Sequence, residues 1–275
     1  MNCSDSVAVS RVGLPKLALR LSLLLLLTTA GLSVAAAEQQ LLRDRDGDGA
    51  VRALAFGDSI TYGVGSSYQP GEYVEDLSSS GARSGYPNRL TGYLGIPIVN
   101  SGEPGELLTG GGVERFASKV VGRSYDIVFI MEGTNDAFPQ TAPIQYAHSL
   151  QKMINVAVAD GKAVVVMTVA PTSGLHSVLM LFTEAYSQTA RELAAVNRVA
   201  LVDVERGLTD ACGIVEDCQL FLQPEGLHPN AKGYDALAQL VAARLVGVDI
   251  TAPGSASQLA SALGIPAVNV LVGSK

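Results

Sequence analysis

The sequence predicts an α/β protein in which helices cover both faces of a parallel β-sheet, a three-layer α/β/α sandwich. Two observations predict this fold class. Short apolar runs rich in strand-forming residues alternate with segments that have the spacing of helices. Polar residues and glycine follow directly where several of these runs end, as they do at the carboxyl edge of a parallel sheet. The alternation favours right-handed crossovers between successive strands.

Turn-forming residues set the limits of the predicted elements. Pro87 is tolerated in the first turn of a helix over 86–94, and Gly95 ends that helix. Gly161 closes a longer helix, and Pro171 stops the strand that comes next. The predicted strands are 51–56, 96–99, 126–131, 163–169 and 199–204, and the other predicted helices are 144–159, 183–195 and 231–245.

The first residues have the pattern of a signal peptide, over 1–37. Basic residues precede the apolar run 21–27, and small residues follow up to Ala37, so cleavage is expected after Ala37. The apolar run is shorter than the roughly 20 residues that a membrane-spanning helix needs, and no cysteine follows it at a lipid-attachment position. We therefore expect a secreted or periplasmic protein without a stable membrane anchor.

Charge and cysteine usage fit export. The net charge of −7 becomes −9 without residues 1–37, which carry three basic side chains and one acidic side chain. An acidic chain of this kind is a poor nucleic-acid binder. Cys3 is removed with the signal, and Cys212 and Cys218 can form a disulfide in an oxidising compartment; the alternative is two free, buried thiols. The oligomeric state is not determined by the sequence.

Residues 51–246 are expected to form one domain, flanked by a polar linker over 38–50 and a tail over 247–275 to which the sequence assigns no role. The linker contains Asp44, Asp46 and Asp48, which match the opening of a calcium-binding loop. The twelfth position of such a loop needs a carboxylate, and here it is Ala55. We interpret the segment as a solvated linker, and calcium binding stays an open alternative.

The residues 56–63 place Ser59 among glycines where the first strand ends. In a parallel sheet this position faces an open crevice, so a hydroxyl held there can meet a substrate. Ser59 is therefore a candidate nucleophile. The same residues also suit an ordinary turn in which an aspartate or serine caps the next helix, and we interpret Asp58 as holding this turn.

Three further loops that follow strands hold Gly105, Asn135 and His228. Together with Ser59 they supply what acyl transfer needs. Histidine can take the proton of a serine hydroxyl, because its ordinary pKa suits a general base. The backbone N–H groups of Ser59 and Gly105 and the amide of Asn135 can donate hydrogen bonds to the oxyanion of a tetrahedral intermediate.

A substrate cleft is expected beside this group. The loop 63–85 leaves the end of the first strand, so Tyr68 and Tyr73 are candidates to line the cleft, with exposed loop aromatics as the alternative. His176, after the fourth strand, is a third candidate. For Asp136 we prefer a structural, capping role.

With these motifs the chain resembles a GDSL esterase/lipase of the SGNH hydrolase superfamily over about residues 51–246. The resembling blocks, in the family's order, are Gly57-Asp58-Ser59, Asn100 to Gly105, Gly133-Thr134-Asn135-Asp136 and His228-Pro229-Asn230. The resemblance implies a flavodoxin-like sheet of five parallel strands and ester hydrolysis through an acyl-serine intermediate, with no metal or organic cofactor. It also implies Ser59 as nucleophile, His228 as base, and Ser59, Gly105 and Asn135 as the oxyanion hole.

One position departs from the family's pattern. The family usually has aspartate three residues before the histidine, and this chain has Glu225. Glutamate can orient the imidazole if the loop absorbs the extra methylene. The rivals for this role are Asp217 and a backbone carbonyl.

The first functional hypothesis is an exported serine esterase acting on a small-molecule, glycan or lipid ester. The alternative is a catalytically silent protein that binds glycan or lipid on the same fold. The absence of tryptophan and the low aromatic content leave no obvious platform for stacking sugars, which favours a short acyl or acetyl ester.

Overall fold

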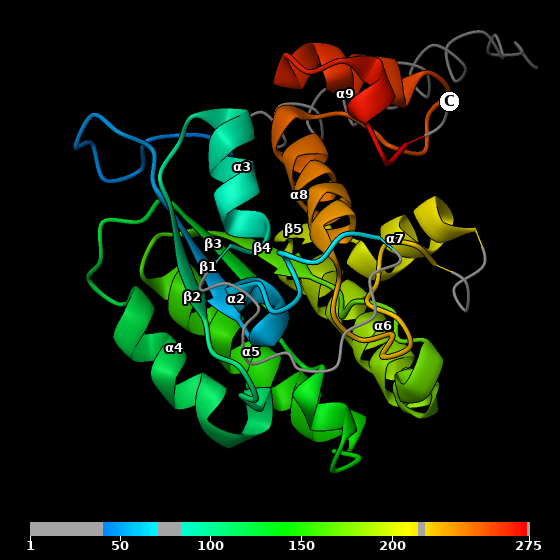
Figure 1. Ribbon diagram of the computed structural model, residues 1–275. Coiled ribbons are helices and arrows are strands. Elements are labelled where there is room, and N and C mark those ends of the chain that lie inside the picture. Colours follow the sequence, from blue (N-terminus) through cyan, green and yellow to red (C-terminus); the bar gives the residue numbers. More distant parts are fainter. Residues whose placement is uncertain (1–40, 71–83, 214–217, 274–275) are drawn as a thin grey trace, which may run out of the picture. The chain divides into compact units, whose positions relative to one another are not determined.

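The computed structural model describes residues 41–70, 84–213 and 218–273, which contain a five-stranded sheet in the order β2-β1-β3-β4-β5 (Figure 1). Every neighbouring pair of strands is parallel, so the predicted fold class is confirmed. The predicted signal peptide, Tyr73 and Asp217 lie outside the described residues. The strands are β1 (Ala53–Gly57), β2 (Ile98–Gly102), β3 (Ile127–Met131), β4 (Ala163–Met167) and β5 (Ala200–Val202).

The register brings the first three strands to an end at the same level. Gly57, the last residue of β1, lies opposite Gly102 of β2 and Met131 of β3. The loops that leave these three strands therefore start side by side. They are the loops that carry Ser59, Gly105 and Asn135.

The sheet has a hydrophobic core on each face. Ala53 and Ala55 of β1 point to a core shared with α3 (Tyr86–Leu94), α7 (Val204–Cys212) and α8 (Ala231–Val246). The alternating residues Leu54 and Phe56 point to the other core. That second core is covered by α4 (Val113–Val120), α5 (Pro143–Ala159) and α6 (Met180–Asn197). Successive side chains of a strand point to opposite faces, so helices on both sides bury both sets.

Helix limits follow the predicted turn chemistry in several places. The helix α3 has a proline in its first turn and ends at Gly95, whose φ of 68° is left-handed. The short helices α4, α7 and α9 (Ser255–Leu263) were not expected from the sequence. Each has only eight or nine residues, too few for a clear periodic pattern.

Both flanking segments contact the domain. Asp126 is fully buried and accepts the N–H groups of Arg45 (2.5 Å) and Arg52 (2.9 Å), which attaches the acidic segment before β1. In the tail, Leu259 of α9 belongs to the same core as α8. The side chain of Gln239 in α8 bonds the backbone of Asn269 and Leu271. Residues 255–272 therefore cover part of α8.

The sulfur atoms of Cys212, at the end of α7, and Cys218 are bonded to each other. Across the ranges that the structure describes, no helix combines the length and the apolar character needed to cross a membrane.

Candidate active site

The turn after β1 presents Ser59 at the first position of α2 (Ser59–Tyr62). Asp58 caps this short helix by accepting the N–H of Ile60 at 2.9 Å. Glycine is required at position 57, because a Cβ there would lie 2.1 Å from the Thr61 hydroxyl and 2.3 Å from the Met131 carbonyl oxygen. The hydroxyl of Ser59 thus comes from a tightly packed turn, and the residue is 7% exposed.

A chain of hydrogen bonds connects Ser59, His228 and Glu225. The Nε2 atom of His228 lies 2.9 Å from Ser59 Oγ, and its Nδ1 atom lies 2.5 Å from Glu225 Oε1. The second carboxylate oxygen of Glu225 accepts the backbone N–H of His228 at 2.9 Å. An ionised carboxylate can only accept, so Nδ1 carries the proton and the lone pair of Nε2 faces the serine.

The loop from Pro224 to His228 is held by its neighbours. The carbonyl oxygen of Gly226 accepts the N–H of Ser173 at 2.8 Å, and the carbonyl oxygen of His228 accepts the N–H of Leu222 at 2.9 Å. Gly226 has a φ of 74°, and a Cβ at this residue would lie 2.2 Å from the Ser173 carbonyl oxygen. Only glycine fits there, and the resulting turn lets the longer side chain of Glu225 reach the imidazole.

The pKa values of the two carboxyl groups near Ser59, those of Glu225 and Asp58, are shifted in opposite directions. Burial acts to raise the pKa of Glu225, but the hydrogen bonds and the charge of His228 outweigh it and hold the pKa below its ordinary value. Glu225 is therefore ionised at neutral pH. Burial raises the pKa of Asp58, one of whose oxygens has no hydrogen-bond partner among the described residues.

The loops of Gly105 and Asn135 are bound to each other. Asn135 begins the 3₁₀ helix η3 (Asn135–Ala137), and its amide Nδ2 donates to the carbonyl oxygen of Glu106 at 2.9 Å. The adjacent carboxylate of Asp136 accepts the backbone N–H groups of Leu108 (2.8 Å) and Thr109 (3.1 Å). Asp136 thus has a structural role between loops. The Asn135 amide therefore bonds the residue that follows Gly105, and Gly105 itself has a φ of 80°.

His176 and Tyr68, two of the predicted cleft residues, contact the segment that carries Glu225 and His228. His176 places Nδ1 2.8 Å from the carbonyl oxygen of Glu225, and its ring meets the edge of Phe138 at a centroid distance of 5.7 Å. The carbonyl oxygen of Tyr68 accepts the N–H of Ala231, three residues after His228, at 2.8 Å.

An ion pair that the sequence analysis missed supports the Gly105 loop. Arg115 of α4 forms a two-pronged pair with the carboxylate of Glu106, with Nε 2.7 Å from Oε1. It also donates to the carbonyl and hydroxyl of Ser101, and its guanidinium lies over the Phe56 ring at 4.0 Å. The sequence does not reveal this pair, because Arg115 reaches Glu106, Ser101 and Phe56 only once the chain has folded.

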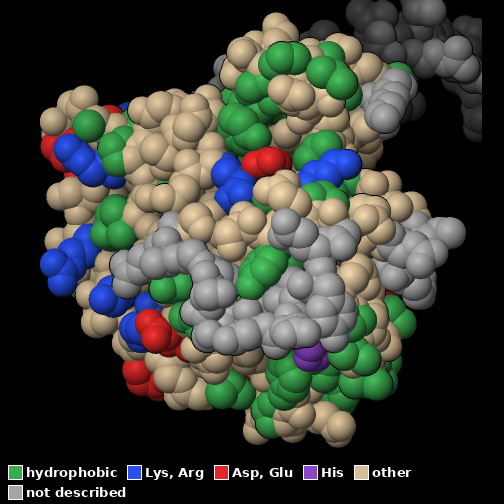
Figure 2. Space-filling view, in the orientation of Figure 1, with side chains coloured by type: hydrophobic (Ala, Val, Ile, Leu, Met, Phe, Trp, Pro, Cys, Tyr) green, Lys and Arg blue, Asp and Glu red, His purple; other side chains and the backbone are tan. Residues whose placement is uncertain are grey.

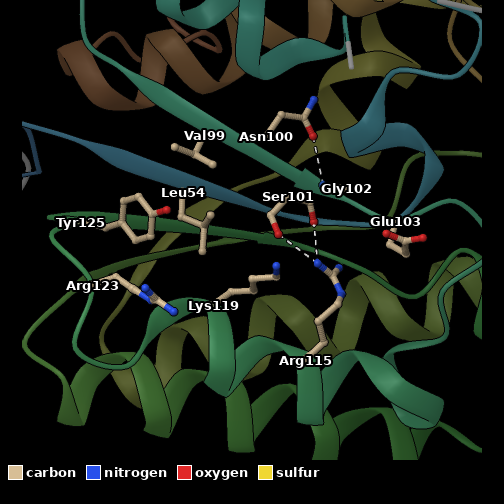
Figure 3. A pocket seen from close by; sticks show the side chains of 10 residues that line it. All are labelled: Leu54, Val99, Asn100, Ser101, Gly102, Glu103, Arg115, Lys119, Arg123 and Tyr125. Atoms are coloured by element: carbon tan, nitrogen blue, oxygen red, sulfur yellow. Dashed lines mark hydrogen bonds between the residues drawn. The ribbon is translucent and has the colours of Figure 1, made fainter. Parts of the chain in front are cut away.

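Arg115 also lines a cavity of about 310 Å³ between β2 and α4 (Figure 3). The figure shows Lys119 and Arg115 pointing from α4 toward β2. Neither Ser59 nor His228 lines this cavity, so it is separate from the serine.

A second feature missed from the sequence is a buried acid directly after β3. Glu132 is 2% exposed, and neither of its carboxyl oxygens has a hydrogen-bond partner among the described residues. Burial raises the pKa of Glu132 well above its ordinary value, and the negative charges of Asp58 and Glu106 raise it further. Burial and the neighbouring carboxylates therefore favour the protonated form of this side chain, which lies next to the Asn135 loop.

The acidic segment before β1 places one oxygen each of Asp44, Asp46 and Asp48 within 4.8 Å of one another. Backbone N–H groups of Gly47 and Gly49 already bond the carboxylate of Asp44. The twelfth position, Ala55, lies buried in β1, so it supplies no ligand.

A parallel sheet that holds a serine, a histidine and a carboxylate in one hydrogen-bonded chain at its carboxyl edge has the arrangement of a serine hydrolase. The model of the GDSL-like lipase/acylhydrolase family matches residues 55–236. The chain belongs to this family and is a carboxylic ester hydrolase.

Solved structures share the fold. LAE5, an α/β hydrolase from the metagenome of Lake Arreo, is 21% identical and superposes with a TM-score of 0.59, covering 73% of this chain and 98% of its own. Axe2, an acetylxylan esterase from Geobacillus stearothermophilus, is 21% identical with a TM-score of 0.58, covering 71% and 94%. A lipase/acylhydrolase from Enterococcus faecalis is 20% identical with a TM-score of 0.56, covering 70% and 93%. No curated protein matches the chain.

The buried acid gives a testable pH dependence. A carboxyl whose pKa is higher in the folded than in the unfolded state stabilises the fold below the unfolded pKa, and this contribution is lost as the pH rises. We expect Glu132→Gln to gain stability relative to the native chain by up to about 1.4 kcal/mol for each pH unit above about 4.3. Denaturant unfolding between pH 4 and 8 measures this difference.

The control is Glu184→Gln, which changes an exposed acid on α6 in the same way. A stability difference between Glu132→Gln and the native chain that stays constant across this pH range would contradict the raised pKa of Glu132.

Proposed function

We propose that this chain is an exported serine esterase that hydrolyses a carboxylic ester through an acyl-serine intermediate. The single observation that carries the proposal is the hydrogen-bonded chain from Ser59 Oγ through His228 to the Glu225 carboxylate. Ser59 is the nucleophile, His228 the general base and Glu225 the residue that orients and charges the imidazole.

The reaction has two halves. The Nε2 atom of His228 takes the proton of Ser59 Oγ while this oxygen bonds to the acyl carbon of the ester. The resulting imidazolium then gives its proton to the leaving alcohol as the carbon–oxygen bond of the ester breaks. In the second half, water loses a proton to Nε2, attacks the acyl carbon, and releases the carboxylic acid with the serine hydroxyl restored.

The charge that develops on the carbonyl oxygen needs hydrogen-bond donors. We assign this task to the backbone N–H groups of Ser59 and Gly105 and to Nδ2 of Asn135. The bond from Asn135 to the carbonyl of Glu106 uses one amide hydrogen and leaves the second for the oxyanion. Because Glu106 follows Gly105, the same bond fixes the spacing between two of the three donors.

Glu225 supports catalysis over silent binding. The alternative of a silent glycan- or lipid-binding protein had its only support in the glutamate at this position, and its carboxylate meets the imidazole as a triad acid would. A carboxylate contact to Nδ1 also favours Glu225 over a backbone carbonyl as the orienting group.

For the substrate we propose a short acyl or acetyl ester, in keeping with the low aromatic content of the chain. The structural neighbours include an acetylxylan esterase and a lipase/acylhydrolase. Export to a secreted or periplasmic location is supported by the signal pattern over 1–37 and by the bonded pair Cys212 and Cys218.

The nucleophile is tested by covalent labelling. We expect a fluorophosphonate to label the purified protein at one residue, Ser59, because its hydroxyl lies 2.9 Å from the histidine base. Mass spectrometry of the labelled peptide locates the adduct, and Ser59→Ala should remove it. Failure to label under conditions that label a control serine esterase would end the acyl-serine proposal.

The acid is tested by Glu225→Gln. This change keeps the size of the side chain and removes its charge, so we expect kcat on a p-nitrophenyl ester to fall by about 10³-fold to 10⁴-fold, as wrong-tautomer variants of serine triads do. Circular dichroism should show an intact fold. Activity close to that of the matched control Glu184→Gln would remove Glu225 from the mechanism.

The oxyanion donor is tested by Asn135→Ala. Loss of one such donor typically lowers kcat by about 10²-fold to 10³-fold, and KM should change little because the donor acts mainly on the transition state. Steady-state kinetics separate the two constants. A rise in KM at unchanged kcat would show that Asn135 serves ground-state binding instead.

A further inference from the structure

An exposed apolar ridge lies beside the candidate active site. Leu175, Val178 and Leu181 are 71%, 79% and 74% exposed. Single exposed hydrophobic residues are normal on a protein surface, but a contiguous group of them marks a contact site. We call these three residues the apolar ridge.

The local backbone aligns the ridge. Leu175 and Val178 belong to the 3₁₀ helix η4 (Gly174–Leu179), in which residues three apart lie above one another. Leu181 continues the same spacing into the first turn of α6. Phe138 and Ile144, which follow β3 at the same edge of the sheet, are also exposed. Figure 2 shows hydrophobic side chains gathered at the lower right of the view, over the start of α6.

The ridge is attached to the loop that carries Glu225. The N–H of Leu175 donates to the carbonyl oxygen of Pro224 at 3.0 Å, and His176 contacts the carbonyl oxygen of Glu225. The Phe138 ring packs against His176. The first residue of the ridge, Leu175, is therefore bonded to the residue that precedes Glu225.

The lack of charged side chains around the ridge indicates which kind of surface it can contact. Residues 174–183 contain no lysine, arginine, aspartate or glutamate, and the whole chain carries a net charge of −7. An anionic membrane would repel such a protein, and residues 174–183 offer no lysine or arginine to attract one. The ridge also protrudes, with each member more than two-thirds exposed, so it suits a broad apolar surface better than one enclosed acyl chain.

We propose that the apolar ridge docks this esterase on the surface of an electrically neutral lipid phase that carries the ester substrate. The inference rests on the proposed function and deepens it by naming the physical form of the substrate. On docking, Leu175, Val178 and Leu181 enter the acyl region of the lipid surface, and the Ser59 site beside them meets an ester at that surface. The contact is reversible, as expected for a few buried side chains.

The binding test uses Ser59→Ala, so that no ester is consumed. We expect this protein to co-sediment with phosphatidylcholine vesicles. Addition of Leu175→Ser, Val178→Ser and Leu181→Ser should lower the partition coefficient at least about tenfold, because each buried aliphatic side chain contributes about that factor. The matched control replaces three exposed valines outside the ridge, Val121→Ser, Val196→Ser near the far end of α6 and Val268→Ser, and should bind like its parent.

Three outcomes overturn the proposal: no vesicle binding by the parent, equal binding by the ridge variant, or an equal loss in the valine control. A parent that sediments as a dimer, with the ridge variant a monomer, would assign the ridge to self-association and also overturn it. Without the Ser59→Ala change, the ridge variant should hydrolyse dissolved p-nitrophenyl acetate at the native kcat/KM. A native chain that does not hydrolyse p-nitrophenyl acetate would instead refute the proposed function.

Discussion

The parallel register of β1, β2 and β3 is the constraint on which the rest of the site depends. Because Gly57, Gly102 and Met131 end their strands at one level, the loops that follow start as neighbours. Their short lengths then leave little freedom for Ser59, Gly105 and Asn135. A slip of one residue in any of these strands would turn its side chains to the opposite face and move its loop away from the others.

The site contains several acidic side chains close together, and each is accommodated by a different combination of partners and burial. Glu225 is stabilised as an anion by His228, and Glu106 forms an ion pair with Arg115. Glu132 has no cationic partner among the described residues, and burial raises its pKa well above the ordinary value, which favours its protonated form. Two carboxyl groups of similar intrinsic acidity, Glu225 and Glu132, thus have pKa values shifted in opposite directions within one site, and their partners and burial decide the direction.

The two faces around the serine differ in chemical character. The side of Gly105 is polar and braced by the Glu106–Arg115 pair. The side of Glu225 leads onto the apolar ridge of η4 and α6. An ester has a polar carbonyl flanked by carbon chains, so a site with one polar and one apolar flank matches the chemistry of its substrate.

The sequence by itself determined the fold class, because strand-length apolar runs that alternate with helical spacing have few other solutions. It also determined the chemical inventory, since Ser59, Asn135 and His228 follow predicted strands in the order of the family that the chain resembles. It did not reveal the short helices, the Glu106–Arg115 pair or the state of Glu132. These depend on contacts between residues far apart in the chain. Only the tertiary structure decided that Glu225 meets His228, that Glu132 is buried among other acids, and that the ridge borders the site, because distance, burial and local charge arise when separate loops converge.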